Sequence, residues 1–268
     1  MAVDSHIQIP KGVLKHFTES SGRVFYLDVA TGKIGLAGAG ILGTEHGYYS
    51  EEQEHYLNKE IETPLTTLAA KVRLFLKSKN TLRLSTTEET VLKRYITAAM
   101  ARSQLSLDAF LSSSVTADLC TDQQNHDDLV YLATMKNNGV AEILKDHFLV
   151  VLINKTDIHL VVPRNCFYAL ISHGFECIVA PISPICALCL FPPEYAERIS
   201  ISKEYRLCHI ENKEDIKLMN QRALMYEYMY NKTFVASATR NELDELVAFR
   251  NERKQDLDRL WEEVHKQE

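Results

Sequence analysis

The sequence contains no long hydrophobic run, although 46% of its residues are hydrophobic. No stretch approaches the roughly 18 consecutive apolar residues that a membrane-spanning helix requires. The first residues, from Met1 to His6, also lack the basic and apolar segments of a secretory signal. We therefore expect a cytoplasmic protein that does not enter a membrane.

The sequence also has fewer basic residues than acidic ones. The 30 Lys and Arg residues are outnumbered by 36 Asp and Glu residues, which gives a formal net charge of −6 at pH 7. Sequence-independent binding to nucleic acid requires a basic surface. The charge balance therefore disfavours nucleic acid as a partner, although it is compatible with a local basic groove.

Cysteine is absent before Cys120, and the chain has six cysteines in all. Cys186 and Cys189 stand inside the apolar run 185–190, where a thiol packs as a small hydrophobic group. The two have the spacing of half a zinc site, for which Cys208 and His209 would supply the other half. However, zinc-binding cysteines normally occupy polar turns, and cysteines three apart on a strand point to opposite faces. We predict reduced thiols, no metal and no cofactor.

The first half of the chain has the pattern of helices. From Ile61 to Leu76 the apolar residues repeat with the 3.6-residue period of an α-helix. A second helix is predicted to start at Ser85, because Ser85-Thr-Thr-Glu88 has the pattern of a capping box. A third helix is expected at about residues 126–146, after a polar segment.

Two β-hairpins are predicted from apolar runs that flank a turn. The first pairs residues 24–29 with the residues that follow Gly32, and it leads into a glycine-rich loop at 35–47. The second pairs residues 148–153 with residues 158–162.

Short strands are expected to follow at residues 166–170, 175–179 and 185–191, separated by glycine and proline. Such near-continuous apolar runs favour strands that are buried on both faces. A helical first half and a strand-rich second half predict an α+β fold. In this fold the helices pack against a largely antiparallel sheet formed mainly by the second half.

We assign residues 1–235 to a single α+β domain, whose last helix is expected from about Asp215 to Tyr230. Residues 236–268 are predicted to form a C-terminal helix. That helix either packs on the domain or, through residues 240–265, joins two copies of the chain in a homodimer.

Two charged residues interrupt the apolar faces of the first two helices. Glu62 shares a face with Leu65 and Ala69, and Arg102 shares a face with Tyr95. An unpaired charge in such a place carries a large desolvation cost, so we expect Glu62 and Arg102 to meet. Such a pair forms either the floor of an active site or a buried ion pair that fixes how two helices dock.

The glycine-rich segment Gly35–Gly40 superficially resembles a phosphate-binding loop. A dinucleotide site requires a strand leading into the loop and a helix leaving it. Here the chain continues without a helix to Tyr48-Tyr49. A close-packed connection is therefore favoured over a nucleotide site, and no Gly-x-Ser-x-Gly nucleophile motif is present.

His6, followed by Pro10 and Leu14-Lys-His-Phe17, combines a histidine, a proline and a Leu-x-x-Phe motif. Later segments continue the same order: Tyr48-Tyr49, the helix with Glu62, the helix that ends at Arg102, the segment 178–184 with its Pro-Ile-Ser-Pro motif, and Asn220. In this order the segments resemble the uncharacterised domain-of-unknown-function family 4238. The resemblance covers about residues 6–235 and marks the chain as a divergent member.

The resemblance implies a pocket but no activity, because the family has no established activity. The implied pocket residues are His6, Glu62, Arg102, Asn165 and Asn220. One departure follows the second hairpin, where the family has Ser-Asp-Asn-Pro and this chain has Pro163-Arg-Asn-Cys166. Arg164 replaces the aspartate, so any chemistry of that aspartate would be lost here.

Two functions remain open from the sequence. The favoured one is a non-catalytic interaction or ligand-binding protein, such as a defence-associated factor, that binds a protein partner or a small ligand through Arg164, Asn165 and Asn220. The alternative is a small hydrolase acting on a phosphodiester. In that case His6 would be the general acid/base, Glu62 would orient it, and Arg102 would steady an anion.

Overall fold

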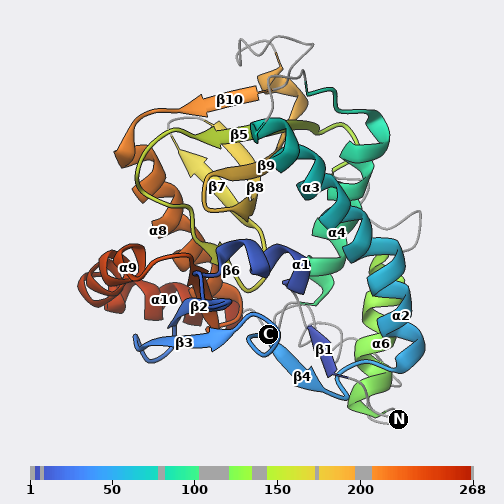
Figure 1. Cartoon of the computed structure of the whole chain (residues 1–268). Coiled ribbons are helices and arrows are strands. Elements are labelled where there is room, and N and C mark those ends of the chain that lie inside the picture. The colour runs from blue at the N-terminus through green and yellow to red at the C-terminus, as the bar shows by residue number, and fades with distance from the viewer. Residues whose placement is uncertain are drawn as a thin grey trace.

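The α+β class is confirmed by the structure, a computed structural model in which helices dominate the first half and sheets the second (Figure 1). The two larger sheets are mostly antiparallel. The structure describes residues 4–6, 9–77, 82–102, 121–134, 144–172, 175–196 and 207–266. No described helix is both long enough and apolar enough to cross a membrane.

The helical elements are, in chain order, α1 (Lys11–Leu14), η1 (Lys15–Phe17), α2 (Glu51–Leu57), η2 (Asn58–Glu62), α3 (Thr63–Lys77), α4 (Thr86–Ala101), α6 (Asp122–Thr134), η4 (Pro193–Tyr195), α8 (Lys213–Tyr230), α9 (Arg240–Glu252) and α10 (Lys254–His265). The strands are β1 (Asp4–His6), β2 (Arg23–Asp28), β3 (Ile34–Gly38), β4 (Thr44–His46), β5 (Phe148–Asn154), β6 (Val162–Pro163), β7 (Tyr168–Ser172), β8 (Phe175–Ser183), β9 (Cys186–Phe191), β10 (Leu207–Ile210) and β11 (Phe234–Ser237).

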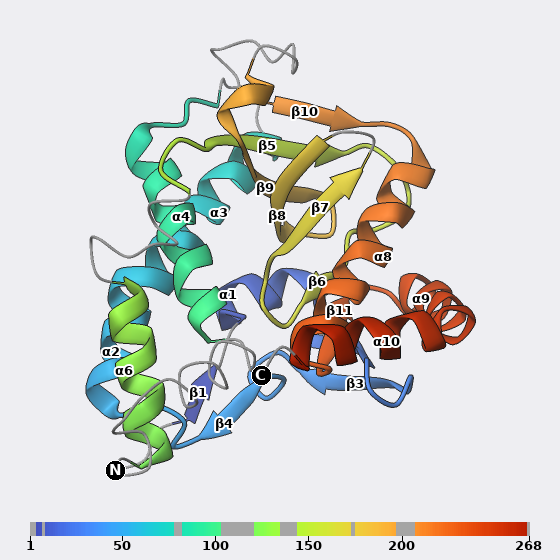
Figure 2. The ribbon, with the colours of Figure 1, turned by 180° about the vertical axis from the view of Figure 1, so that it is seen from behind.

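The larger sheet has five strands in the order β10-β5-β9-β8-β7. Figures 1 and 2 show α3 and α4 on one side of this sheet and α8 on the other. Successive residues of β5 confirm the two-sided burial: Leu149 and Val151 join the core of α3 and α4, whereas Val150 and Leu152 join the core of α8.

A second, four-stranded sheet has the order β3-β2-β11-β6, and all its pairs are antiparallel. The predicted hairpin around Gly32 is confirmed, because Leu27 pairs with Ile34. The glycine-rich segment was only partly a loop, since β3 extends to Gly38 and β4 begins at Thr44. Strand β4 pairs with β1 in a separate two-stranded ribbon.

The predicted hairpin between residues 148–153 and 158–162 is wrong. Strand β5 pairs with β9 and β10, while β6 crosses to the other sheet and pairs with β11. The side chain of Asn154 accepts from the backbone N–H of Thr156 and donates to the carbonyl of Ile158. This side-chain turn leads the chain away from β5, which sequence periodicity does not reveal.

Two further boundaries differ from the sequence prediction. The third helix begins at Asp122 and is described to Thr134; residues 135–143 of the expected helix lie outside the described residues. Strand β8 continues through Pro181, where its register with β9 shifts between Pro181 and Ser183. A proline is tolerated inside a strand at such an irregularity.

The C-terminal segment forms two helices in place of the single helix expected, with a break at Arg253 between α9 and α10. Both helices contact α8, beside which Figure 2 shows them. Helix α9 also contacts β2. Leu243, Leu246 and Leu257 are buried in the core that they share with α8. The boundary placed after residue 235 falls inside β11.

Candidate functional site

Helices α2 and α3 form one continuous rod, interrupted by the π-helical turn η2. Pro64 has no N–H to donate to the carbonyl of Glu60, and its ring would crowd that carbonyl. The wider turn accommodates the proline, because the N–H of Thr63 bonds to the carbonyl of Asn58, five residues earlier. Such π turns occur often at functional sites, and this one ends at Glu62.

Glu62 and Arg102 form the predicted ion pair. Nη1 of Arg102 lies 3.1 Å from Oε1 of Glu62. The Arg102 side chain is fully buried, whereas 16% of the Glu62 side chain remains exposed. Arg102 directly follows α4, and its Nε also donates to the carbonyl of Ala98. The two helices therefore present the pair as the sequence predicts, with the cation inside and the carboxylate toward solvent.

For both Glu62 and Arg102, burial shifts the pKa in one direction and the contact between them shifts it in the other. Burial raises the pKa of Glu62, and Arg102 counteracts that rise. Burial alone would lower the pKa of Arg102, but Tyr49, Glu62 and Tyr95 together raise it. Because water reaches Glu62 and not Arg102, we expect the carboxylate to stay ionised at neutral pH as the counter-ion of the buried guanidinium.

Buried aromatic and thiol groups surround the inner side of the pair. Burial raises the pKa values of Tyr49 and Tyr95 well above the usual range, and it raises the pKa of Cys166 to about 12. These groups are therefore neutral at physiological pH. The hydroxyl of Tyr49 is buried and has no hydrogen-bond partner among the described residues. The inner side of the pair is therefore lined by groups that carry no charge at neutral pH.

Cys166 ends a tight turn between β6 and β7. Its N–H donates to the carbonyl of Pro163, and its φ of 59° lies in the left-handed region that non-glycine residues rarely adopt. The turn holds Arg164, whose Nη2 lies 3.1 Å from Oε1 of Glu45. Arg164 also acts electrostatically on Tyr48, whose pKa burial raises to about 12.

On the outer side of Glu62 lies a polar pocket of about 470 Å³. Its lining combines the ends of several segments: Pro10, Lys11, Gly12, Gly40, Thr44, Glu54, Asn58, Glu62, Thr63, Thr66 and Thr67. Hydroxyl and carboxylate groups dominate this lining. A Cβ at Gly12 would come within 2.7 Å of Thr66, so only glycine permits this close approach.

The structure brings only some of the predicted site residues together at this pocket. The opening segment meets Glu62 at the pocket through Pro10. His6 pairs with Thr44 along the β1–β4 ribbon, and Thr44 lines the pocket. The side chain of His6 lies outside the described residues, so its role as general acid/base remains a prediction.

Arg164, Asn165 and Asn220 are not part of the pocket lining in the described chain. Asn220 joins α8 to the segment before β6, since its amide accepts from the N–H of Val161 and donates to the carbonyl of His159. The side chain of Asn165 is fully buried, and neither polar atom has a hydrogen-bond partner among the described residues. The family resemblance placed Asn165 and Asn220 in one pocket with Glu62. In the structure Asn220 lies apart from that pocket, where α8 meets the segment before β6.

Three buried charged residues of the described chain were not predicted from the sequence, namely Glu227, Glu242 and Arg250. Glu227 on α8 is fully buried, and its Oε1 accepts from the hydroxyl of Thr233. Burial raises the pKa of this carboxyl group. Glu227 follows Asn220 by seven residues and Leu224 by three, so it stands on the apolar face of α8. As with Glu62, a charge among apolar residues at helical spacing is the signal in the sequence that predicts a buried group here.

The described residues contain no cluster of three or more His, Cys, Asp or Glu side chains that could hold a metal ion. Cys186 and Cys189 are buried and free, as are Cys166 and Cys177. Burial raises the pKa of the Cys186 thiol to about 12, so it is protonated and inert. These thiols pack as core groups.

Comparison of the chain with protein-family models, with curated proteins and with solved structures finds no match. The resemblance to family 4238 therefore remains a prediction from the sequence motifs. The geometry of the site has to carry the functional argument.

Proposed function

We propose that this protein is a non-catalytic binding protein that holds a small polar ligand in the pocket beside Glu62. The observation that carries the proposal is the orientation of the ion pair. Arg102 holds Glu62 from the buried side, while the free side of the carboxylate lines a pocket of about 470 Å³. A preorganised polar group in a concave site is the usual basis of ligand recognition.

The lining supports a ligand rich in hydrogen-bond donors. Glu54 and Glu62 supply carboxylate acceptors. The hydroxyls of Thr44 and Thr63 already donate to the carbonyl of Gly40 and the side chain of Asn58, so toward a ligand they act as acceptors. The hydroxyl of Thr66 can donate or accept. Hydroxyl and amino groups of a ligand would donate to the carboxylates. A sugar, an amino sugar or a polyamine has this chemistry.

The same geometry weakens the case for a phosphodiester hydrolase. Arg102 would have to touch the phosphate, but its side chain has no exposed surface. Glu62 is already paired with Arg102, and the carboxylate of Glu54 offsets the ammonium of Lys11, so the lining offers an anionic substrate no uncompensated positive charge. The hydrolase therefore remains the second candidate, dependent on the untested role of His6.

The test is a binding screen by thermal shift, followed by calorimetry, with glucose, glucosamine and spermidine as probes. We expect at least one probe to raise the melting temperature of the wild type. Thr66→Val and Glu54→Gln should weaken its binding by about tenfold, because each removes one hydrogen-bonding group. Glu52→Gln, an exposed site on the same helix, is the matched control and should bind normally.

Two results would contradict this proposal. One is the absence of a shift with all three probes. The other is cleavage of single-stranded RNA or DNA by the wild type that Glu62→Gln abolishes while the variant remains folded. That second result would establish the hydrolase.

The location and partners of the protein belong to the same proposal. We place it in the cytoplasm, and this is supported by free, buried thiols such as Cys177 and Cys189. A homodimer through residues 240–265 would have to use the outer faces of α9 and α10, because Leu243 and Leu257 already face the core.

A further inference from the structure

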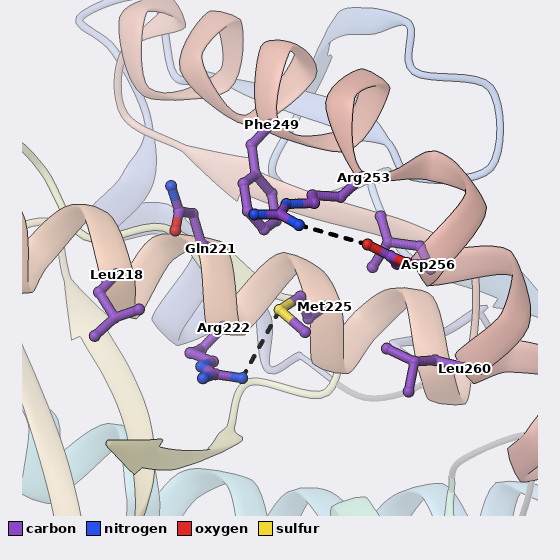
Figure 3. Close-up of a pocket in the computed structure, with 9 residues that line it drawn as sticks. Leu218, Gln221, Arg222, Met225, Phe249, Arg253, Asp256 and Leu260 are labelled. Atoms are coloured by element: carbon purple, nitrogen blue, oxygen red, sulfur yellow. Dashed lines mark hydrogen bonds and ion pairs between the residues drawn. The ribbon is translucent and has the colours of Figure 1, made fainter. Parts of the chain in front are cut away.

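A second cavity, of about 260 Å³, lies between α8 and the two C-terminal helices (Figure 3). One wall is a single face of α8, on which Leu218, Arg222 and Met225 follow one another at helical spacing. Phe249 and Leu260 form the apolar part of the opposite wall. The cavity therefore has an apolar interior with polar groups at its edge.

The guanidinium of Arg222 stands at this edge without a carboxylate. In the part of the chain that the structure describes, Arg222 forms no ion pair, and its buried Nε has no hydrogen-bond partner. Its Nη1 has only a weak contact with Sδ of Met225 at 3.9 Å (Figure 3). The buried Nε therefore lacks a hydrogen bond that an anionic ligand can supply.

The other charges of the cavity do not compensate Arg222. Arg253 and Asp256 pair with each other across 3.6 Å, as Figure 3 shows. Asp256 also pairs with Arg259 at 3.7 Å, so the one carboxylate of the lining is already engaged and leaves the positive charge of Arg222 uncompensated. An anionic group placed beside Arg222 would neutralise its positive charge and accept hydrogen bonds from its guanidinium.

We propose that this cavity binds a small monocarboxylate with an apolar body. The carboxylate accepts hydrogen bonds from Arg222, and the body packs against Phe249 and Leu260. Met225, with its flexible thioether, can adjust to the shape of the body. This site shares no lining residue with the pocket beside Glu62, so it is independent of the function proposed there.

Ligands of other classes fit less well. A neutral apolar molecule would remove water from Arg222 without replacing its hydrogen bonds, which is costly. A sugar would leave its hydroxyls against Phe249, Leu257 and Leu260. Only a molecule that joins one anionic group to an apolar body satisfies both parts of the lining.

The test compares octanoate with octanol, which has the same chain length and no charge. Binding is measured by calorimetry and by the fluorescence of Trp261, the one tryptophan of the chain, which follows Leu260 on α10. We expect octanoate to bind at least about tenfold more tightly than octanol, as for a hydrogen bond to a charged group. Equal binding, or none, would overturn the proposal.

Matched variants then locate the carboxylate. Arg222→Gln should weaken octanoate binding about tenfold and leave octanol unaffected. Arg240→Gln is the control, because Arg240 lies on α9, is largely exposed and pairs with Asp244, and neither residue lines the cavity. A loss of octanoate binding in the control, or retention in Arg222→Gln, would contradict the assignment.

A second copy of the chain is the competing occupant of this cavity. If two copies docked here, octanoate binding would weaken as the protein concentration rises, and light scattering would show a dimer. That outcome would also overturn the proposal, whereas a constant affinity across concentrations supports a small-molecule site.

Discussion

Two buried arginines, one in each half of the fold, show how differently the molecule handles the same charge. Arg102 is paired with a carboxylate that faces a pocket. Arg250 on α9 donates from Nε to the carbonyl of Val29 at 2.7 Å, from Nη2 to the carbonyl of Ala30, and from Nη1 to the side chain of Asn251. Both side chains are almost completely buried.

The groups that Arg102 and Arg250 bind indicate what each arginine does in the fold. Backbone carbonyls keep a fixed position and do not titrate, so Arg250 can only fasten the β2–β3 turn to α9. A carboxylate with one side toward solvent can also contact a ligand. Glu242 repeats the architectural pattern, since it accepts from the N–H of His159, the hydroxyl of Ser237 and the hydroxyl of Thr239. Glu62, by contrast, keeps one side for the pocket.

The largest effect is expected from Glu62→Gln, which leaves the cation of Arg102 buried without its counter-ion. We expect the free energy of unfolding in urea to fall by about 3 kcal/mol. Arg102→Met should cost less, about 1 kcal/mol, because water in the pocket can solvate Glu62. The double variant should recover most of the loss, because no buried charge remains. A double variant as unstable as the sum of both changes would contradict this interpretation.

Next in size is Arg250→Met, which deprives two backbone carbonyls in the β2–β3 turn of their donor. We expect a loss of about 2 kcal/mol in urea unfolding. No change of a second side chain should repair it, because the carbonyls of Val29 and Ala30 remain. Probe binding at the pocket beside Glu62 should be unchanged in the folded variant. Weaker probe binding in Arg250→Met would contradict the assignment of different roles to Arg102 and Arg250.

A smaller effect isolates the contact between Arg250 and the turn. Gly32 has a φ of +76°, and a Cβ there would lie 2.9 Å from Nη1 of Arg250. Gly22 has a nearly identical φ of +77°, with nothing within 4 Å of such a Cβ. Gly22→Ala should therefore cost about 1 kcal/mol from the left-handed backbone alone. Gly32→Ala should cost more, and equal losses would show that the turn yields without disturbing Arg250.

The smallest effect concerns pH. Burial lowers the pKa of His16 from 6.5 to about 4, with further lowering from Arg73, Lys77 and Lys15. The unfolded chain takes up this proton first, so the stability present above pH 6.5 is lost as pH falls toward 4. After allowance for solvent screening, the effect is under about 1 kcal/mol. His16→Gln should flatten that part of the stability curve, whereas Arg250→Met should shift the curve without changing its slope.

Sequence reasoning predicted those features that depend on local pattern. The capping box at Ser85 is present with both hydrogen bonds, and the helical period placed Glu62 on the face that meets Arg102. The β2–β3 hairpin follows from its turn glycine. Each of these depends on residues close in the sequence, where spacing fixes geometry.

The features that the sequence did not predict depend on distant partners. Periodicity identified β5 as a strand, but the choice between residues 158–162 and β9 as its neighbour depends on tertiary pairing. The pocket likewise joins Lys11, Gly40 and Thr66, which no local motif connects. The π turn before Pro64 could have been suspected, since a proline inside a long helical pattern demands an irregularity.

Strand β11 has a consequence for biosynthesis. It lies between β2 and β6, and its Phe234 pairs with Asp28 near the other end of the chain. The hairpin of β2 and β3 must therefore leave the ribosome with one edge open and wait until β11 emerges. Contacts between such distant segments form slowly. We therefore expect this four-stranded sheet to close only after its last strand has been synthesised.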